Sequence, residues 1–240
     1  MYNFYPMKFL FVFAHPDDET FSSGGTIAKL TQNKHQVILI TATKGEAGEL
    51  GNPPITTRDK IAQVREQELR RSTKILGVSD IHFLGLVDGT LRYIKNTNIE
   101  NKILKIIKEE KPDVVITFDK DGGSNHPDHK AISRATTKVF KDYKNLTKKH
   151  VRLYHTAMPR SFIKEFEKKG LDYNAFGKVK GVKDNEITSI ININDTLQTK
   201  IKALKEHKTQ HQDWERFLQR IKGIKVSNEF FKLIDENYLA

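Results

Sequence analysis

A phrase of four residues occurs twice in the chain, each time directly after an apolar run. Residues 15–18 read His-Pro-Asp-Asp, and residues 126–129 read His-Pro-Asp-His. The runs before them, residues 9–13 and 114–118, have the length and composition of buried β-strands. Imidazole and carboxylate groups are ligands that divalent transition metals accept, and a carboxylate to spare can transfer protons. The two phrases therefore predict a metal-dependent catalytic site.

The rest of the sequence alternates predicted strands with predicted helices. Strands are expected at residues 8–13, 36–43, 81–84, 114–118, 151–157 and 187–193. Helices are expected at residues 22–34, 57–76, 99–110, 127–141 and 195–208, whereas residues 160–186 carry no clear pattern. This alternation predicts an α/β fold: a Rossmann-like, doubly wound, mostly parallel sheet with strand order 3-2-1-4-5 and helices on both faces. No linker and no long repeat is evident, so residues 1–240 are expected to form a single domain.

The predicted sheet brings the two His-Pro-Asp phrases together. In the order 3-2-1-4-5, the first and fourth strands are neighbours at the point where the winding reverses. Ligands of such sheets bind at this point, beyond the carboxyl ends of the strands. Pro127 fits the first turn of its helix, which places His126 at the cap and His129 in the first turn. The spacing leaves open which of these two histidines is a ligand.

Composition limits the classes of partner and site. Lysine and arginine outnumber aspartate and glutamate by 41 to 30, for a net charge of +11. The lysines are scattered without interleaved aromatic residues, which favours a solvated surface, and no nucleic-acid partner is expected. There is no cysteine, so a metal must rest on nitrogen and oxygen ligands. No apolar stretch approaches the ~20 residues of a membrane span, and no secretory leader is apparent, so we expect a cytoplasmic protein.

The two phrases also resemble a known family. Residues 14–19, Ala-His-Pro-Asp-Asp-Glu, together with residues 126–129, resemble the PIG-L/LmbE-like family of zinc-dependent N-acetylglucosaminyl de-N-acetylases. Residues 65–78 resemble the second helix of that family, and residues 202–210 resemble its late helix. The resemblance implies a hydrolase that removes an N-acetyl group from a small-molecule conjugate of the N-acetylglucosamine type. Because members often form trimers and hexamers, it also implies a homo-oligomer.

The resemblance assigns a metal site. It implies one zinc ion per chain, held by His15, Asp18 and His129, with the fourth position open as in catalytic zinc sites. Iron or another divalent ion is an alternative on such ligands. Glu19 is expected to cap or brace the motif loop.

The resemblance also assigns catalytic and substrate-binding residues. Asp17 would be the general base, taking a proton from the attacking water and giving it to the departing amine. His126 would stabilise the oxyanion, and Asp128 would orient His126. Arg65 and His207 would contact the substrate, although an ordinary solvated arginine and an ordinary helix histidine are the alternatives at these two positions.

Two other functions are compatible with parts of the same pattern. A non-catalytic metal- or sugar-binding relative would keep the same motifs without turnover. A receiver-like signalling domain also has paired aspartates after a strand, but it binds Mg²⁺ through oxygen ligands, and Leu84-Gly85-Leu86 stands where its acceptor aspartate is expected.

Gly24-Gly25 is expected to allow close packing, and the Gly/Pro-rich residues 45–54 are expected to form a rim or lid over the site.

Overall fold

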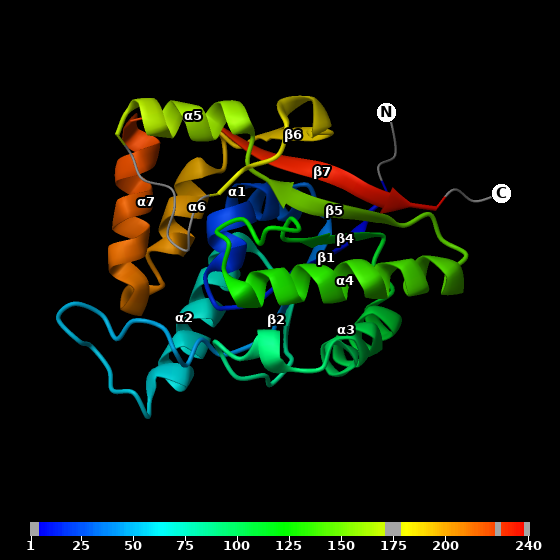
Figure 1. The fold of residues 1–240 in the computed structure, drawn as a ribbon, viewed down its shortest axis with the longest axis horizontal. Coiled ribbons are helices and arrows are strands. Elements are labelled where there is room, and N and C mark those ends of the chain that lie inside the picture. Colours follow the sequence, from blue (N-terminus) through cyan, green and yellow to red (C-terminus); the bar gives the residue numbers. More distant parts are fainter. Residues whose placement is uncertain (1–4, 171–178, 224–226, 238–240) are drawn as a thin grey trace.

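The computed structural model describes residues 5–170, 179–223 and 227–237 (Figure 1). Within these residues, seven strands form one sheet in the order β3-β2-β1-β4-β5-β7-β6. The strands are β1 (Lys8–Phe13), β2 (Gln36–Thr41), β3 (Asp80–Phe83), β4 (Val114–Thr117), β5 (Arg152–Ala157), β6 (Ser189–Asn192) and β7 (Asn228–Glu236). β1 to β5 pair in parallel, and β7 runs antiparallel to both β5 and β6. The predicted α/β fold with order 3-2-1-4-5 is therefore confirmed.

The central strands are apolar because both of their faces are covered. From Leu10 to Phe13 and throughout β4, the strands are buried, as expected for a parallel sheet between two layers of helices. Val12 lies opposite Thr117 in the register of β1 and β4. The two strands thus end at the same edge of the sheet, and the chain leaves both of them toward the same place.

Two groups of helices cover the sheet. The helices are α1 (Asp18–Gln32), α2 (Ile61–Leu76), α3 (Asn96–Glu110), α4 (Pro127–Leu146), α5 (Arg160–Lys168), α6 (Leu197–Leu204) and α7 (His211–Gly223). α1, α2 and α6 contact one another, whereas α3 contacts α4, and Figure 1 shows these groups in separate layers. In the described part of the chain, no helix combines the length and the apolarity needed to cross a bilayer.

Several boundaries differ from those that the sequence predicts. α1 begins at Asp18 rather than Ser22, because the acidic Asp18 and Glu19 occupy its first turn, where negative charge is favoured. α2 begins four residues later than expected. α5, α7 and β7 were not predicted at all; residues 171–178 of the stretch without a pattern lie outside the described residues.

The glycine pair in α1 permits close packing against a later part of the chain. A Cβ atom on Gly25 would lie 2.7 Å from the side chain of Ile193, and one on Gly24 would lie 3.1 Å from Cγ of Lys200. The hydroxyl of Thr196 also donates a hydrogen bond to the carbonyl of Gly25 (2.8 Å). Close packing was predicted here, and its partners are the segment after β6 and helix α6.

A buried ion pair joins the same region to β7. Nζ of Lys200 lies 2.6 Å from Oε1 of Glu229, and both side chains are buried. The Glu229 carboxylate also accepts hydrogen bonds from the backbone N–H groups of Gly25 (3.0 Å) and Thr26 (2.7 Å). This carboxylate thereby connects β7, α6 and the interior of α1.

Candidate active site

Both His-Pro-Asp phrases lie at the carboxyl edge of the sheet, at the starts of α1 and α4. His126 is the cap residue of α4 and Pro127 is its first residue, a position where proline loses no hydrogen bond. His129 follows one turn later. The rings of His15 and His129 have centroids 5.1 Å apart, so residues more than a hundred positions apart in sequence meet in one site.

Three side chains direct nitrogen and oxygen atoms toward one point. Nδ1 of His15 and Nε2 of His129 are 3.2 Å apart, and Nε2 of His129 is 3.2 Å from Oδ1 of Asp18. The other oxygen of Asp18 accepts the backbone N–H of His15 at 2.7 Å. This hydrogen bond fixes the carboxylate and leaves Oδ1 for a ligand.

The spacing of these atoms fits a tetrahedral transition metal. Zinc bonds of about 2.0–2.1 Å at tetrahedral angles separate the ligand atoms by roughly 3.3 Å, close to the two 3.2 Å separations of His129 Nε2 from His15 and from Asp18. Burial opposes the charged form of Asp18, but the imidazoles of His129 and His15 hold its pKa well below the usual range. A cation therefore meets an ionised carboxylate. A nitrogen of His126 lies within 4.8 Å of the His15 and His129 nitrogens and borders the same space.

The surroundings of His129 fix its orientation and its tautomer. Its Nδ1 lies 2.9 Å from the carbonyl oxygen of Gly122, an acceptor that keeps a proton on this nitrogen and frees Nε2 for a metal. The ring stacks on Phe118 with a centroid separation of 4.1 Å. Gly122 has φ +70°, and a Cβ atom there would lie 2.7 Å from Cβ of His129, so glycine is required at this position.

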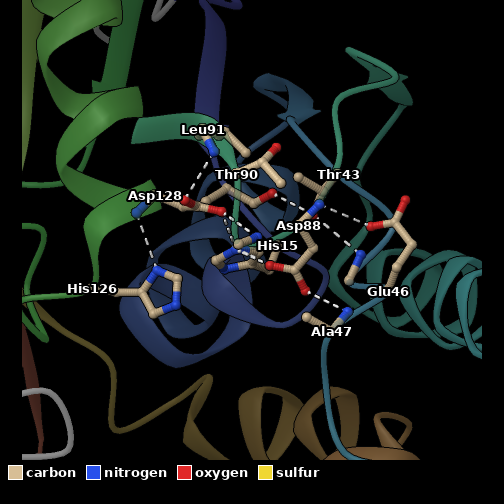
Figure 2. Close-up of polar contacts among 12 residues, drawn as sticks. His15, Thr43, Glu46, Ala47, Asp88, Thr90, Leu91, His126 and Asp128 are labelled. Atoms are coloured by element: carbon tan, nitrogen blue, oxygen red, sulfur yellow. Dashed lines mark hydrogen bonds and ion pairs between the residues drawn. The ribbon is translucent and has the colours of Figure 1, made fainter. Parts of the chain in front are cut away.

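The other nitrogen of His15 faces two carboxylates, as Figure 2 shows. Nε2 lies 2.9 Å from Oδ1 of Asp88 and 3.5 Å from Oδ2 of Asp128. Burial would lower the pKa of His15, but Asp128, Asp18 and Asp88 raise it well above 6.5. Burial likewise disfavours ionised Asp88, yet the hydrogen bond and the charge of His15 lower the Asp88 pKa to about 2.

Sequence reasoning missed Asp88. The residue follows β3 in the loop at the carboxyl edge of the sheet, and it is followed by a glycine in the pair Asp88-Gly89. Its position after a strand at the ligand-binding edge was the available signal. The comparison with a receiver domain pointed instead to Leu84-Gly85-Leu86, where no acidic residue stands. Oδ2 of Asp88 accepts the backbone N–H of Ala47 (3.0 Å), so the loop at residues 45–54 is tied to the site, and its role as a lid stays a prediction.

Asp17 has the environment of a base that works near neutral pH. Burial raises its pKa to about 7, although the Arg65 guanidinium opposes the rise. Nη2 of Arg65 donates to Oδ2 of Asp17 (3.0 Å) and to the carbonyl of Pro16 (2.6 Å), and Nη1 donates to the carbonyl of Gly45 (3.0 Å). The Asp17 side chain keeps 13% of its surface exposed, so part of it can be reached from solvent.

His126 is arranged to donate a hydrogen bond while neutral. Its Nδ1 accepts the backbone N–H of Asp128 (3.2 Å), which leaves the ring proton on Nε2. Burial and the neighbouring His129 and His15 lower its pKa to about 4. The sequence predicted that Asp128 orients His126. In the structure, the backbone N–H of Asp128 makes this contact. The Asp128 carboxylate instead accepts the N–H groups of Gly89 (2.7 Å) and Leu91 (3.1 Å).

The two residues expected at the substrate are both buried. Arg65 has 3% of its surface exposed and makes the contacts with Asp17, Pro16 and Gly45 described above, so direct substrate contact by Arg65 stays a prediction. His207 has no exposed surface, and Nε2 lies 3.5 Å from Oε1 of Glu19. The ring is thus fully enclosed in this structure, and substrate binding by His207 stays a prediction.

Sequence comparisons identify relatives of this chain. The model of the PIG-L family, described as GlcNAc-PI de-N-acetylase, matches residues 10–140, which include both His-Pro-Asp phrases. A probable N-acetyl-alpha-D-glucosaminyl L-malate deacetylase 2 of Bacillus anthracis is 39% identical over 55% of this chain, and the match spans 58% of that relative's length. A 1D-myo-inositol 2-acetamido-2-deoxy-alpha-D-glucopyranoside deacetylase of Actinosynnema mirum is 31% identical over 88% of this chain and 83% of its own.

Solved structures share the fold. N,N'-diacetylchitobiose deacetylase from Pyrococcus horikoshii has a TM-score of 0.68 at 24% identity, with 95% of this chain and 84% of that chain covered. The 4-carboxy-2-hydroxymuconate hydratase GalB from Pseudomonas putida has a TM-score of 0.69 at 15% identity, with 97% and 98% covered. Since one of these proteins is a deacetylase and the other a hydratase, the fold alone does not decide the reaction.

Proposed function

Because this chain belongs to the PIG-L family, we propose that it is a metal-dependent deacetylase that removes the acetyl group from an N-acetylglucosamine conjugate. The observation that carries the proposal is the convergence of His15, Asp18 and His129, with Asp17 beside them. A receiver-like domain needs oxygen ligands rather than two imidazoles, and the placement of the Asp17 carboxylate beside the candidate ligands favours catalysis over metal binding alone.

The ligand set supports zinc as the metal. Two imidazole nitrogens and one carboxylate oxygen suit zinc, and the absence of cysteine from the sequence leaves no competing thiolate site. A divalent ion at this position supplies a Lewis acid that polarises the amide carbonyl and makes water more acidic. The contribution of the protein is to hold the three ligand atoms at separations that suit the ion and to supply the groups that move protons.

Two residues would handle charge and protons during hydrolysis. Asp17 accepts a proton from the attacking water at its carboxylate and delivers it to the nitrogen of the departing amine. Nε2–H of His126 donates a hydrogen bond to the oxyanion of the tetrahedral intermediate, a contact worth roughly 3–4 kcal/mol in comparable enzymes. Arg65 keeps the Asp17 carboxylate in place through the hydrogen bond described above.

A direct test measures acetate release from N-acetylglucosamine conjugates, including the inositol and malate conjugates named for the relatives, with zinc and with a chelator. Activity that depends on the metal is expected with at least one conjugate. Replacing Asp17 with Asn keeps the size of the side chain but removes the base. We expect kcat to fall by about 10²–10⁴-fold while the bound metal stays at the wild-type level.

The control for this test is the ligand variant His129→Ala. It should lose the metal together with the activity, which separates a missing base from a missing ion. Wild-type turnover in a metal-loaded Asp17→Asn protein would refute the role of Asp17. No release from any acetylated amino sugar in the presence of zinc would refute the proposed function.

A further inference from the structure

The backbone of Asp17 has a conformation that needs support. Its φ angle is +110°, in the region that glycine favours and that other residues enter at a cost of about 1–3 kcal/mol. Such a conformation persists only where surrounding contacts hold it. Asp17 lies just before α1 and makes no side-chain capping bond to that helix, so its side chain does not itself stabilise the turn.

A buried carboxylate holds the Asp17 backbone. Oε2 of Glu19 accepts the backbone N–H of Asp17 at 3.1 Å. Glu19 is completely buried, so it offers no surface for a substrate to contact. Its other oxygen accepts hydrogen bonds from the hydroxyl of Thr20 and, at 3.4 Å, from that of Ser72 on α2. Glu19 is thus fixed between the motif loop and a neighbouring helix.

The segment around His207, far from Glu19 in the sequence, packs beside the Glu19 carboxylate. His207 follows α6, is fully buried, and brings Nε2 to 3.5 Å from Oε1 of Glu19. Among the described residues, neither ring nitrogen of His207 makes a hydrogen bond of good geometry. The polar contact that the structure gives this ring is therefore its 3.5 Å approach to the Glu19 carboxylate. Two residues further on, Thr209 donates from its N–H (2.9 Å) and its hydroxyl (2.7 Å) to the carboxylate of Glu68 on α2. These bonds fasten the segment in place.

We propose that Glu19 and His207 are positioning residues for the base: Glu19 holds the Asp17 backbone in its positive-φ conformation, and His207 holds Glu19. The proposal rests on the deacetylase function proposed above, because it takes Asp17 to be the base. Neither residue touches the substrate. Their effect is on where the Asp17 carboxylate lies, and a displacement of 1 Å at a reacting group can lower the rate by roughly 100-fold.

The experiment compares Glu19→Ala, Glu19→Gln and His207→Leu with the control Glu206→Gln. Glu206 precedes His207 but pairs with Arg71 at the surface (3.0 Å). In Glu19→Ala we expect kcat per bound metal to fall by about 10–100-fold, with KM within about twofold. Glu19→Gln keeps an acceptor oxygen for the Asp17 N–H and should recover most of the loss. His207→Leu should give a smaller fall, and Glu206→Gln should match the wild type.

A second measurement does not depend on activity. Hydrogen exchange of the Asp17 amide should accelerate by about tenfold or more in Glu19→Ala relative to amides in the core, because its acceptor is gone. An unchanged Asp17 exchange rate, or an unchanged kcat per bound metal, would overturn the proposal. If the wild type released no acetate from any substrate, the deacetylase function would fail, while faster exchange at Asp17 would still show that Glu19 holds this backbone.

Discussion

At the scale of single residues, His15 connects two parts of the site. Nδ1 faces the ligand position shared with His129, and Nε2 faces Asp88. A carboxylate behind a ligating histidine fixes the orientation of the ring and raises the basicity of the ligand. Asp88 is itself held by the backbone N–H of Ala47, so the loop after β2 influences the metal site through a single intermediate residue.

Replacing Asp88 with Asn should weaken metal binding without removing a ligand. Loss of the carboxylate behind His15 is expected to lower metal affinity by about 10–100-fold, measured by competition with a chelator. The matched control is Glu46→Gln, because Glu46 accepts the Asp88 backbone N–H (3.2 Å) without contact to His15 among the described interactions. Equal affinities of the Asp88→Asn protein and the wild type would contradict this role.

The proposed role of Asp17 as the base predicts how activity depends on pH. Only the ionised carboxylate accepts a proton, so kcat/KM should fall as the pH drops through the pKa of Asp17. Without metal that pKa is raised to about 7, and a bound cation moves it lower by favouring the charged form. Since Arg65 also favours that form, Arg65→Met should move the acidic limb of the profile to higher pH. An unmoved or lowered midpoint in this variant would contradict the assignment.

The meeting of the two His-Pro-Asp phrases could be predicted from the sequence, because each phrase follows an apolar strand and the two strands are neighbours in the sheet. The family resemblance, rather than the spacing, assigned the three ligands, and that assignment stays a prediction. Glu19 was expected to brace the motif loop, whereas Asp88 was not predicted. Asp88 and Glu19 act through contacts with the backbone and with buried rings, which depend on how loops pack. The family resemblance assigned His207 to the substrate, whereas the structure shows a fully buried ring beside the packed helices α1, α2 and α6.

At the scale of elements, the buried pair Lys200–Glu229 sets the position of α1 relative to α6 and β7. Removal of one member leaves the other charge buried without a partner, at a cost of about 3–5 kcal/mol. We therefore expect Glu229→Ala to lower the free energy of unfolding by an amount in this range, measured by denaturation in urea. The variant also leaves the N–H groups of Gly25 and Thr26 without their acceptor.

The surface pair Lys29–Asp195 provides the comparison for this prediction. Its atoms are 3.1 Å apart, but the two side chains are 34% and 57% exposed. Exposed pairs contribute about 0–1 kcal/mol, so Asp195→Ala should change stability little. Similar losses in Asp195→Ala and Glu229→Ala would show that burial of the Lys200–Glu229 pair has no special effect.

The centre of the parallel sheet was predictable because β1, β2 and β4 contain continuous apolar runs. The positions of β6 and β7 in the sheet were not predictable, because neither strand is a continuous apolar run. β6 alternates half-buried with exposed residues, and the first four residues of β7 alternate half-buried with buried ones. Residues 228–236 mix apolar with polar and charged side chains, and nothing local shows that they insert between β5 and β6. Such pairing between distant segments is decided by the whole fold rather than by local pattern.

At the scale of the whole molecule, a buried histidine makes the free energy of unfolding depend on pH. His155 on β5 lies 2.8 Å from Oγ1 of Thr137 on α4, and burial lowers its pKa to about 4. Above pH 6.5 the ring is neutral in both the folded and the unfolded state. As the pH falls from 6.5 to 4, only the unfolded state gains the proton, so stability is lost across this window.

The variant His155→Gln should remove this dependence. A fall of the pKa from 6.5 to about 4 corresponds to about 3 kcal/mol. The decrease in the free energy of unfolding between pH 7 and pH 4 should therefore be smaller in the variant by an amount of that order, measured by urea denaturation at each pH. Parallel curves for the two proteins would exclude His155 as a source of acid sensitivity.

The order of strands has a consequence for protein synthesis. While the ribosome is making the chain, β5 and β6 emerge before β7, which lies between them in the finished sheet. Until residues 228–236 have been translated, β5 keeps an open edge, and β6 lacks the neighbour that pairs with it. Open edges invite pairing with other chains. A nascent polypeptide that has β5 and β6 but not yet β7 thus exposes an edge that can pair with other chains.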